Sequence, residues 1–208
     1  MANPSNTQPL LPGHSVLADT PPYLSPPIEG SAQQLEPGLV FYELAHCGKL
    51  NLRGTTALAA PVKTAIGCDF PPAANRFNAA GERRLVWLGP DEYLLLCEAG
   101  KELGLRESLA GMLADKSATV NNVTDALCAL MLTGPAVRTV LAKGCSLDLH
   151  PTEFSQGACA QTLLAHAAVT ILAVQDNNFM VLCRSSFAPY LHQWLKDASL
   201  EFGVKFST

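Results

Sequence analysis

Short apolar runs separated by turn residues fill the chain from Gly38 onward. Runs bounded by Gly, Pro, Asn and Asp are typical of buried strands, whereas apolar residues spaced three and four apart are typical of helices. The pattern predicts strands at residues 39–44, 50–52, 85–88, 93–97, 118–125, 130–132, 160–164, 169–174 and 179–183. It predicts helices at 55–66, 103–113 and 136–143, and a final helix over 187–195 that is capped by Ser185 or Ser186.

The stretch from Leu130 to Pro151 contains the plan on which the rest is organised. Its apolar strand is followed by Gly134, which allows a sharp turn, and by Pro135, which the first turn of a helix tolerates. Lys143 is typical of a helix C-terminus, and Gly144 is predicted to cap the helix in a left-handed conformation.

The chain contains this plan twice, because three features of its first half recur in order in the second half. The matches, 77 to 86 residues apart, are Gly54 with Gly134, Gly67-Cys68 with Gly144-Cys145, and residues 93–97 with 179–183. A repeat of this length indicates a fused pair of supersecondary units rather than a solenoid. The predicted fold is α+β, with duplicated strand–helix–strand–strand–helix units and antiparallel sheets. We expect a single domain over 38–208, made of pseudo-repeats at about 38–124 and 125–200.

Residues 1–37 contain eight of the fifteen prolines and no periodic apolar pattern. This composition predicts an extended, polyproline-like arm, which is either a floppy tail or a segment that lies across a partner. Because no core periodicity falls within it, removing residues 1–36 is expected to leave the isolated fold intact and to weaken assembly.

Composition excludes several classes of protein. Fourteen basic and eighteen acidic residues give a formal charge of -4 without a basic stripe, which disfavours nucleic-acid binding. No basic leader precedes an apolar run, and no apolar run is long enough to span a membrane, so we expect a cytoplasmic protein. Seven cysteines without a C-x-x-C pair are interpreted as buried small hydrophobes in a reducing compartment.

The titratable residues do not assemble a recognisable catalytic pattern. His46 and Cys47 are adjacent, and neighbours on a strand face opposite ways, so a thiolate–imidazole couple is disfavoured. Asp91 and Glu92 occupy a hairpin turn, where a solvated tip is favoured over an acid/base pair. The five histidines (14, 46, 150, 166 and 192) lack the spacing of metal ligands.

Three further places carry polar groups of uncertain purpose. Arg83 and Arg84 are interpreted as exposed charges at a sheet end, with an anion or a partner carboxylate as the alternative. Asp148 and His150 follow the central helix and suit a polar interface contact. Residues 143–146, Lys-Gly-Cys-Ser, lack the upstream glycine of a phosphate loop. We therefore expect no catalytic, cofactor-binding or metal-binding residue on this chain.

A set of ordered motifs resembles the gamma subunit of heterotetrameric sarcosine oxidase over roughly residues 38 to 200. The motifs are residues 86–95 (VWLGPDEYLL), 125–130 (DALCAL), 141–145 (LAKGC), 147–151 (LDLHP), 159–164 (CAQTLL) and 184–188 (RSSFA), with Tyr190-Leu191 and Trp194-Leu195. The duplicated unit also resembles the folate-binding fold of the glycine-cleavage T-protein.

The resemblance implies a subunit of an enzyme that oxidatively demethylates sarcosine to glycine. The products besides glycine are hydrogen peroxide and 5,10-methylenetetrahydrofolate, or formaldehyde in the absence of folate. The partners implied are the alpha, beta and delta subunits, which carry FAD, FMN, NAD and zinc, with tetrahydrofolate as co-substrate. The gamma subunit is expected to be structural and to carry none of these cofactors.

One departure from the T-protein pattern supports a structural role. The resemblance places an acidic pair where this chain has Arg83 and Arg84, and a guanidinium cannot act as a carboxylate base. Two alternatives stay open. One is a stand-alone folate-dependent aminomethyl transferase. The other is a folate-binding maturation factor, which the Lys143-Gly144-Cys145 sequence begins to match but Ser146 does not continue.

Overall fold

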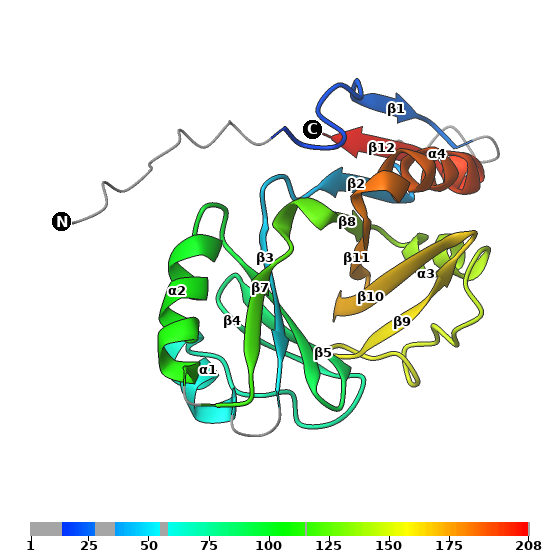
Figure 1. Cartoon of the computed structure of the whole chain (residues 1–208). Coiled ribbons are helices and arrows are strands. Elements are labelled where there is room, and N and C mark those ends of the chain that lie inside the picture. Colours follow the sequence, from blue (N-terminus) through cyan, green and yellow to red (C-terminus); the bar gives the residue numbers. More distant parts are fainter. Residues whose placement is uncertain (1–13, 28–35, 55–57, 115, 208) are drawn as a thin grey trace.

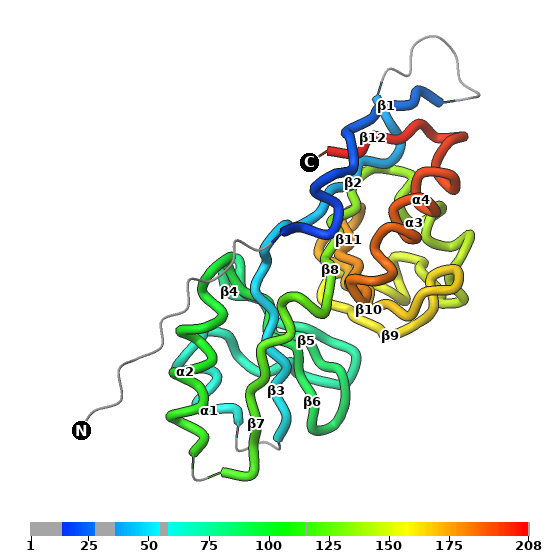
Figure 2. The backbone as a smooth tube through the Cα atoms, turned by 45° about the horizontal axis from the view of Figure 1, so that its top comes forward, coloured from blue at the N-terminus to red at the C-terminus, as the bar shows by residue number. Residues whose placement is uncertain are grey.

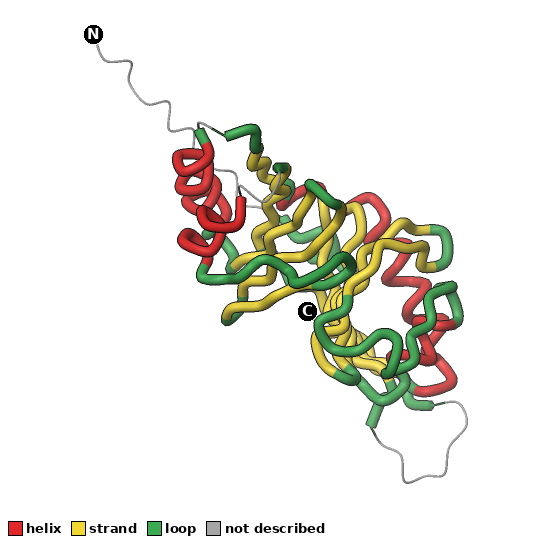
Figure 3. The backbone as a smooth tube through the Cα atoms, turned by 90° about the horizontal axis from the view of Figure 1, so that it is seen from below, coloured by secondary structure: helices red, strands yellow, loops and turns green. Residues whose placement is uncertain are grey.

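The computed structural model describes residues 14–27, 36–54, 58–114 and 116–207. Their strands form two sheets, and helices cover the outer face of each (Figure 1). Figure 3 shows this layering, with helices toward the two ends of the molecule and strands between them. The predicted α+β fold is confirmed, and all but one of the described strand pairs are antiparallel, as expected.

The five-stranded sheet has the order β4-β5-β6-β3-β7. Its strands are β3 (Gly48–Arg53), β4 (Phe77–Ala80), β5 (Arg83–Gly89), β6 (Glu92–Cys97) and β7 (Thr119–Asn122). Helices α1 (Ala59–Ile66) and α2 (Glu102–Leu113) pack on its outer face. Their shared core contains Leu50, Leu52, Leu58, Val62, Leu85, Leu95 and Leu109, all of them fully buried.

The seven-stranded sheet has the order β1-β12-β2-β8-β11-β10-β9. Its strands are β1 (Tyr23–Ser25), β2 (Leu39–Glu43), β8 (Leu127–Thr133), β9 (Cys159–Leu164), β10 (Ala167–Gln175), β11 (Asn178–Arg184) and β12 (Val204–Ser207). Helices α3 (Val137–Ala142) and α4 (Ala188–Ser199) cover it on the outside. Short 3-10 turns lie at Thr124–Ala126, Ser185–Phe187 and Leu200–Phe202.

The inner faces of the two sheets meet in a third apolar cluster. Leu94 and Leu96 of β6 belong to it with Met180 of β11 and Leu172 of β10, and each is at most 2% exposed. The alternation of the strands explains this, because Leu95 of β6 points the other way, into the core under α1 and α2. The two sheets therefore share one continuous interior.

The predicted strands and helices occur, with two errors at helix ends. Gly134 makes the sharp turn expected of it: its φ is 127°, and an added Cβ would lie 2.4 Å from the carbonyl oxygen of Gly38. Gly144 is not a left-handed cap. It is needed for space, since an added Cβ would lie 2.5 Å from Cζ2 of Trp194. Ser185 does not cap α4, because its hydroxyl donates to the carbonyl of Asp125 at 2.7 Å.

Sheet membership does not follow the boundary between the predicted repeats. β2 precedes that boundary, yet it pairs with β8 and β12 in the seven-stranded sheet. The chain then crosses to the five-stranded sheet through β3 and returns at β8, a path visible in Figure 2. The division into two pseudo-repeats stays a prediction.

The expectation that the N-terminal segment contributes nothing to the fold is wrong for residues 14–27. β1 pairs with β12 at the edge of the seven-stranded sheet, and Leu17 is only 3% exposed within its core. Glu43 accepts hydrogen bonds from the amide of Leu17 at 3.1 Å and from the hydroxyl of Ser15. Residues 1–13 and 28–35 lie outside the described residues, so contact between them and a partner stays a prediction.

An aromatic cluster joins this segment to the C-terminus. The ring of Tyr23 lies 5.9 Å from that of Phe206 and 5.6 Å from that of His192, which α4 contributes. His192 is 8% exposed, and its Nε2 atom has no hydrogen-bond partner. Burial, together with the nearby Lys196, holds the pKa of His192 below its usual value.

Replacing Leu17 with alanine tests whether the segment stabilises the fold. The change removes a buried side chain, so we expect a loss of about 2–5 kcal/mol in the free energy of unfolding, measured by urea denaturation. Leu24→Ala is the matched control, because Leu24 is 62% exposed on β1. Its effect is expected to stay within about 0.5 kcal/mol. Equal effects of the two substitutions would contradict the burial of Leu17 in the core of the seven-stranded sheet.

His192 predicts a pH dependence of stability. Its folded-state pKa lies below the value of the unfolded chain, so under acidic conditions the unfolded chain binds a proton that the folded chain does not. Stability is therefore expected to fall as pH drops below about 6.5. In urea titrations between pH 7.5 and 5.5, the His192→Leu variant is expected to lose less stability than the wild type. Parallel losses in both proteins would count against this assignment.

Candidate functional site

A cleft of about 640 Å³ opens where the two sheets diverge. The register across the seven-stranded sheet shows how it forms. Met180 lies opposite Leu172, and both are buried against the five-stranded sheet. Two residues along the strands, Leu182 lies opposite Thr170, which is half-buried. At the end of the face, Leu163 on β9 is 58% exposed. The sheets therefore separate progressively along this face.

The cleft walls combine apolar and polar side chains. The five-stranded sheet and the segment after β7 contribute Asn51, Leu88, Glu92, Leu94, Val123 and Ala126. The seven-stranded sheet contributes Leu127, Gln161, Thr162, Ala168, Val169, Thr170, Leu182, Cys183 and Arg184. Clefts of this size with a few polar groups are ordinary binding sites, which makes it the candidate functional site.

Glu92 is the one carboxylate among the described residues that line the cleft, and it is already bound on both oxygens. Asn51 donates to its Oε1 at 2.8 Å, and Arg53 donates to its Oε2 at 2.7 Å. The expectation of a solvated hairpin tip is correct for Asp91, which is exposed, but wrong for Glu92. A carboxylate whose two oxygens already accept hydrogen bonds from neighbouring side chains is poorly placed to take a proton from a ligand.

Arg184 provides the charge in the cleft that remains unpaired. It is the last residue of β11 and is exposed. Among the described residues its guanidinium makes no hydrogen bond or ion pair. Across the cleft floor, Gln161 donates to the carbonyl of Leu88 at 2.7 Å and so ties β9 to the end of β5. The cleft walls therefore combine apolar side chains with hydrogen-bonded polar ones, and an unpaired guanidinium lies at the rim.

Apart from Glu92, the predicted candidates lie outside this cleft. Arg83 bonds Glu98 at 3.0 Å and the carbonyl of Ile66 at 3.4 Å, and Arg84 bonds the carbonyl of Glu82 at 2.9 Å. Neither guanidinium lines the cleft. The ion pair of Arg83 with Glu98 lies at the end of the sheet beside α1. These two arginines, which stand where the T-protein resemblance implies an acidic pair, are both hydrogen-bonded within the chain.

His46 and Cys47 do not form a couple, although the expected reason for this was wrong. They lie between β2 and β3 rather than on a strand, and His46 is exposed with a φ of 60°. Behind them lies Lys49, which is 3% exposed. Its Nζ donates to the carbonyl of Cys47 at 2.7 Å and to that of Thr124 at 3.4 Å. Lys49 thus ties the start of β3 to the segment before β8.

The loop after α3 is held by local contacts. The side chain of Asp148 accepts from the amide of His150 at 2.8 Å, and the His150 ring bonds the Thr152 hydroxyl at 2.8 Å. Lys143 binds the side chain of Glu201 and lies over the ring of Phe202 at 4.8 Å. The side chains of Lys143, Asp148 and His150 thus have hydrogen-bond partners within the chain and need no ligand to supply them. Their role as an interface with a partner stays a prediction.

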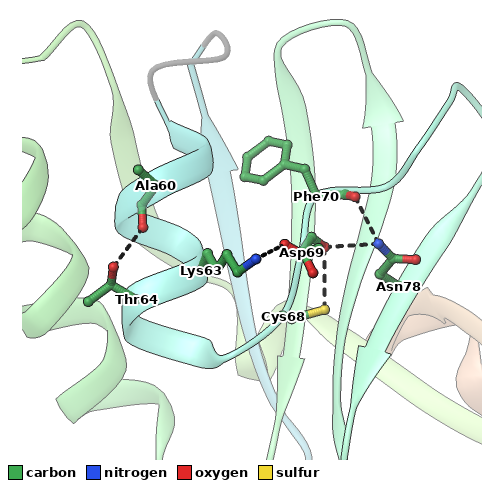
Figure 4. A network of polar contacts seen from close by, with 7 residues as sticks. All are labelled: Ala60, Lys63, Thr64, Cys68, Asp69, Phe70 and Asn78. Carbon is green, nitrogen blue, oxygen red and sulfur yellow. Dashed lines mark hydrogen bonds and ion pairs between the residues drawn. The ribbon is translucent and has the colours of Figure 1, made fainter.

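All seven cysteines are free thiols, and six of them are buried. Burial raises the pKa of Cys97 to about 11 and that of Cys159 to about 11. Burial also raises the pKa of Cys47 and of Cys68. The Cys68 thiol lies 3.5 Å from the carbonyl oxygen of Asp69, in the network at the end of α1 shown in Figure 4. Their raised pKa values favour the protonated thiol at neutral pH, and three of the four are also buried.

Within the described residues, no group of three or more His, Cys, Asp or Glu side chains is placed to hold a metal ion. Over the same part of the chain, no helix is long and apolar enough to cross a membrane.

Comparison with known proteins gives a consistent result. The family model for the sarcosine oxidase gamma subunit family matches residues 53–201. The gamma subunit of sarcosine oxidase from Corynebacterium sp. (strain U-96) is 33% identical over 88% of this chain and 89% of its own length. The corresponding Arthrobacter sp. subunit is 32% identical over 79% of this chain and 81% of its own length. This chain belongs to the sarcosine oxidase gamma subunit family.

Solved structures agree with the family. A chain of heterotetrameric sarcosine oxidase from Corynebacterium sp. U-96, solved in complex with pyrrole 2-carboxylate, superposes with a TM-score of 0.74 and 32% identity. The match covers 79% of this chain and 85% of that one. The glycine cleavage system aminomethyltransferase T from Bartonella henselae superposes with a TM-score of 0.60 at 16% identity. It covers 82% of this chain and 48% of that one, and it shows a shared fold alone.

Sequence reasoning missed the cleft and the residues that define it. Asn51 and Arg53 meet Glu92 because β3 pairs with β6, and no local pattern in the sequence signals that pairing. The alternation of side chains on β9 could have indicated the cleft. Gln161 and Leu163 follow Cys159 at a spacing of two residues, so all three side chains lie on the same face of the sheet, and Cys159 is buried there.

The thiols give a direct chemical prediction. Brief treatment of the folded chain with iodoacetamide at pH 7.5 is expected to modify Cys47, the half-exposed thiol, before the six buried ones. Peptide mass spectrometry measures each site, and unfolding in urea is expected to expose all seven. The Cys47→Ser variant is the control and should lose the early modification. Rapid modification of a buried cysteine would identify an activated thiol that this account lacks.

Proposed function

We propose that this chain is the non-catalytic, structural gamma subunit of a flavin-dependent heterotetrameric sarcosine oxidase. Membership of the gamma subunit family carries the proposal, together with the heterotetrameric assembly named for the related structure. The assembled enzyme would oxidatively demethylate sarcosine to glycine and form hydrogen peroxide, with tetrahydrofolate accepting the one-carbon unit.

The state of the polar residues supports a structural role. The Glu92 carboxylate is bound by Asn51 and Arg53, and the pKa of the Cys47 thiol is raised. Arg83 is paired with Glu98 at the position where the resemblance implies an acid. A subunit that assists assembly needs none of these groups free, whereas a transferase needs a base near its ligand.

The finer parts of the proposal concern the partners. Alpha, beta and delta subunits would accompany this chain and would carry FAD, FMN, NAD and zinc, with no cofactor on the gamma subunit itself. A cytoplasmic location fits the seven free thiols, because disulfides are rare in a reducing compartment.

Co-expression of the tagged chain with the other oxidase subunits tests this function. Affinity purification is expected to recover a coloured flavin complex that consumes oxygen when sarcosine is added. Leaving this chain out is expected to lower the yield of the complex. Recovery of the tagged chain alone, as a colourless monomer, would contradict the proposal.

The stand-alone transferase remains the second candidate, because the fold is shared with aminomethyltransferase T. Titration calorimetry of the isolated chain with tetrahydrofolate separates the two. The structural reading predicts no saturable heat at high micromolar ligand. Micromolar binding together with one-carbon transfer by the isolated chain would favour the transferase.

A further inference from the structure

The far end of the cleft is a sheet face that nothing in the described chain covers. Opposed residues of an antiparallel pair share one face, so Leu163 lies beside Ala168, which lines the cleft. Ala168 is exposed and Leu163 is 58% exposed, although both point to the side on which Cys159 and Leu172 are buried. The same face is thus core at one end and bare at the other.

The charged side chains of the cleft favour an occupant that carries a carboxylate. Glu92 is neutralised by Arg53, with Asn51 on its second oxygen. Arg184 lies opposite Leu127 on the bare end of the face, and its guanidinium makes no hydrogen bond or ion pair within the described part of the chain. An occupant that carries a carboxylate would pair with this guanidinium, and one that carries a cation would be repelled.

The edge of the sheet favours a polypeptide as occupant. β9 is the last strand of the seven-stranded sheet and pairs along its length with β10 alone, although Cys159 at its start also donates to the carbonyl of Asn75 at 2.9 Å. An extended segment that runs along β9 would bond its free backbone groups while its side chains reach the bare face. A small molecule would use the cleft and leave that strand edge unpaired.

We propose that the cleft beside β9 receives an extended segment of a partner oxidase subunit. An apolar side chain of the segment would lie against Leu163 and Ala168, and an adjacent Asp or Glu would pair with Arg184. This inference rests on the proposed function, because it needs a partner subunit to supply the segment. The cleft is then an assembly site, and its polar groups position the partner.

Two substitutions that add negative charge at the cleft test the inference in the co-expressed complex. Arg184→Glu and Leu163→Glu are both at exposed positions, so the chain is expected to fold, as thermal unfolding would show. Each is expected to weaken capture of the partner subunits by at least about tenfold, because each places a negative charge against the acidic segment. Arg106→Glu and Leu103→Glu are matched controls on the exposed side of α2 and should assemble as the wild type does.

Photo-crosslinking identifies the occupant directly. Benzoylphenylalanine at Ala168 is expected to crosslink to a partner peptide that contains Asp or Glu, whereas the same group at Gly104 of α2 should not. A Lys substitution of that acid in the partner should restore the assembly of Arg184→Glu.

The outcomes separate the two proposals. If the wild-type chain captures no partner, the proposed function fails. If wild type and both cleft variants assemble equally, the function stands and the cleft inference is overturned. A small molecule found by native mass spectrometry with the wild-type chain, and lost in Arg184→Glu without loss of assembly, would also overturn it.

Discussion

The contact between the inner faces of the two sheets is the constraint on which the rest of the structure depends. Leu94, Leu96, Leu172 and Met180 fill it without polar atoms, so each sheet is buried on both sides where they meet. Farther along the same face, Leu163 and Ala168 point inward but are exposed within the described chain. The contact between the sheets thus forms the apolar interior, and their divergence opens the cleft.

This arrangement explains why the polar residues of the chain look structural. Lys49 and Glu92 are held by fixed partners on neighbouring segments, and Arg138 donates to the carbonyls of Leu149 and Phe154. Buried or half-buried charges of this kind are tolerated when they are hydrogen-bonded, and they fix the path of the loops. Among the charged side chains that line the cleft in the described chain, the guanidinium of Arg184 is the one without a partner.

Local chemistry made most elements predictable from the sequence. Alternation and turn residues located the hairpin of β5 and β6, and Gly134 marked a turn that an added Cβ would block. Gly144 was misjudged because its reason is the approach of Trp194 from α4, a contact between distant segments. The N-terminal segment was misjudged similarly, since the burial of Leu17 and the pairing of β1 with β12 depend on the C-terminus. Long-range pairing also sets the cleft, which is why no motif revealed it.

The central claim is that this gamma subunit family member builds an enzyme without taking part in its chemistry. The turnover of sarcosine per assembled complex tests it most directly. The measurement would use complexes that contain Glu92→Gln or Cys47→Ser in this chain, normalised to bound flavin. If this chain has no catalytic group, turnover per flavin in these complexes is expected to equal that of the wild type, even if the amount of assembled complex changes. A loss of about tenfold or more in turnover per intact complex would place a catalytic group on this chain and contradict the account.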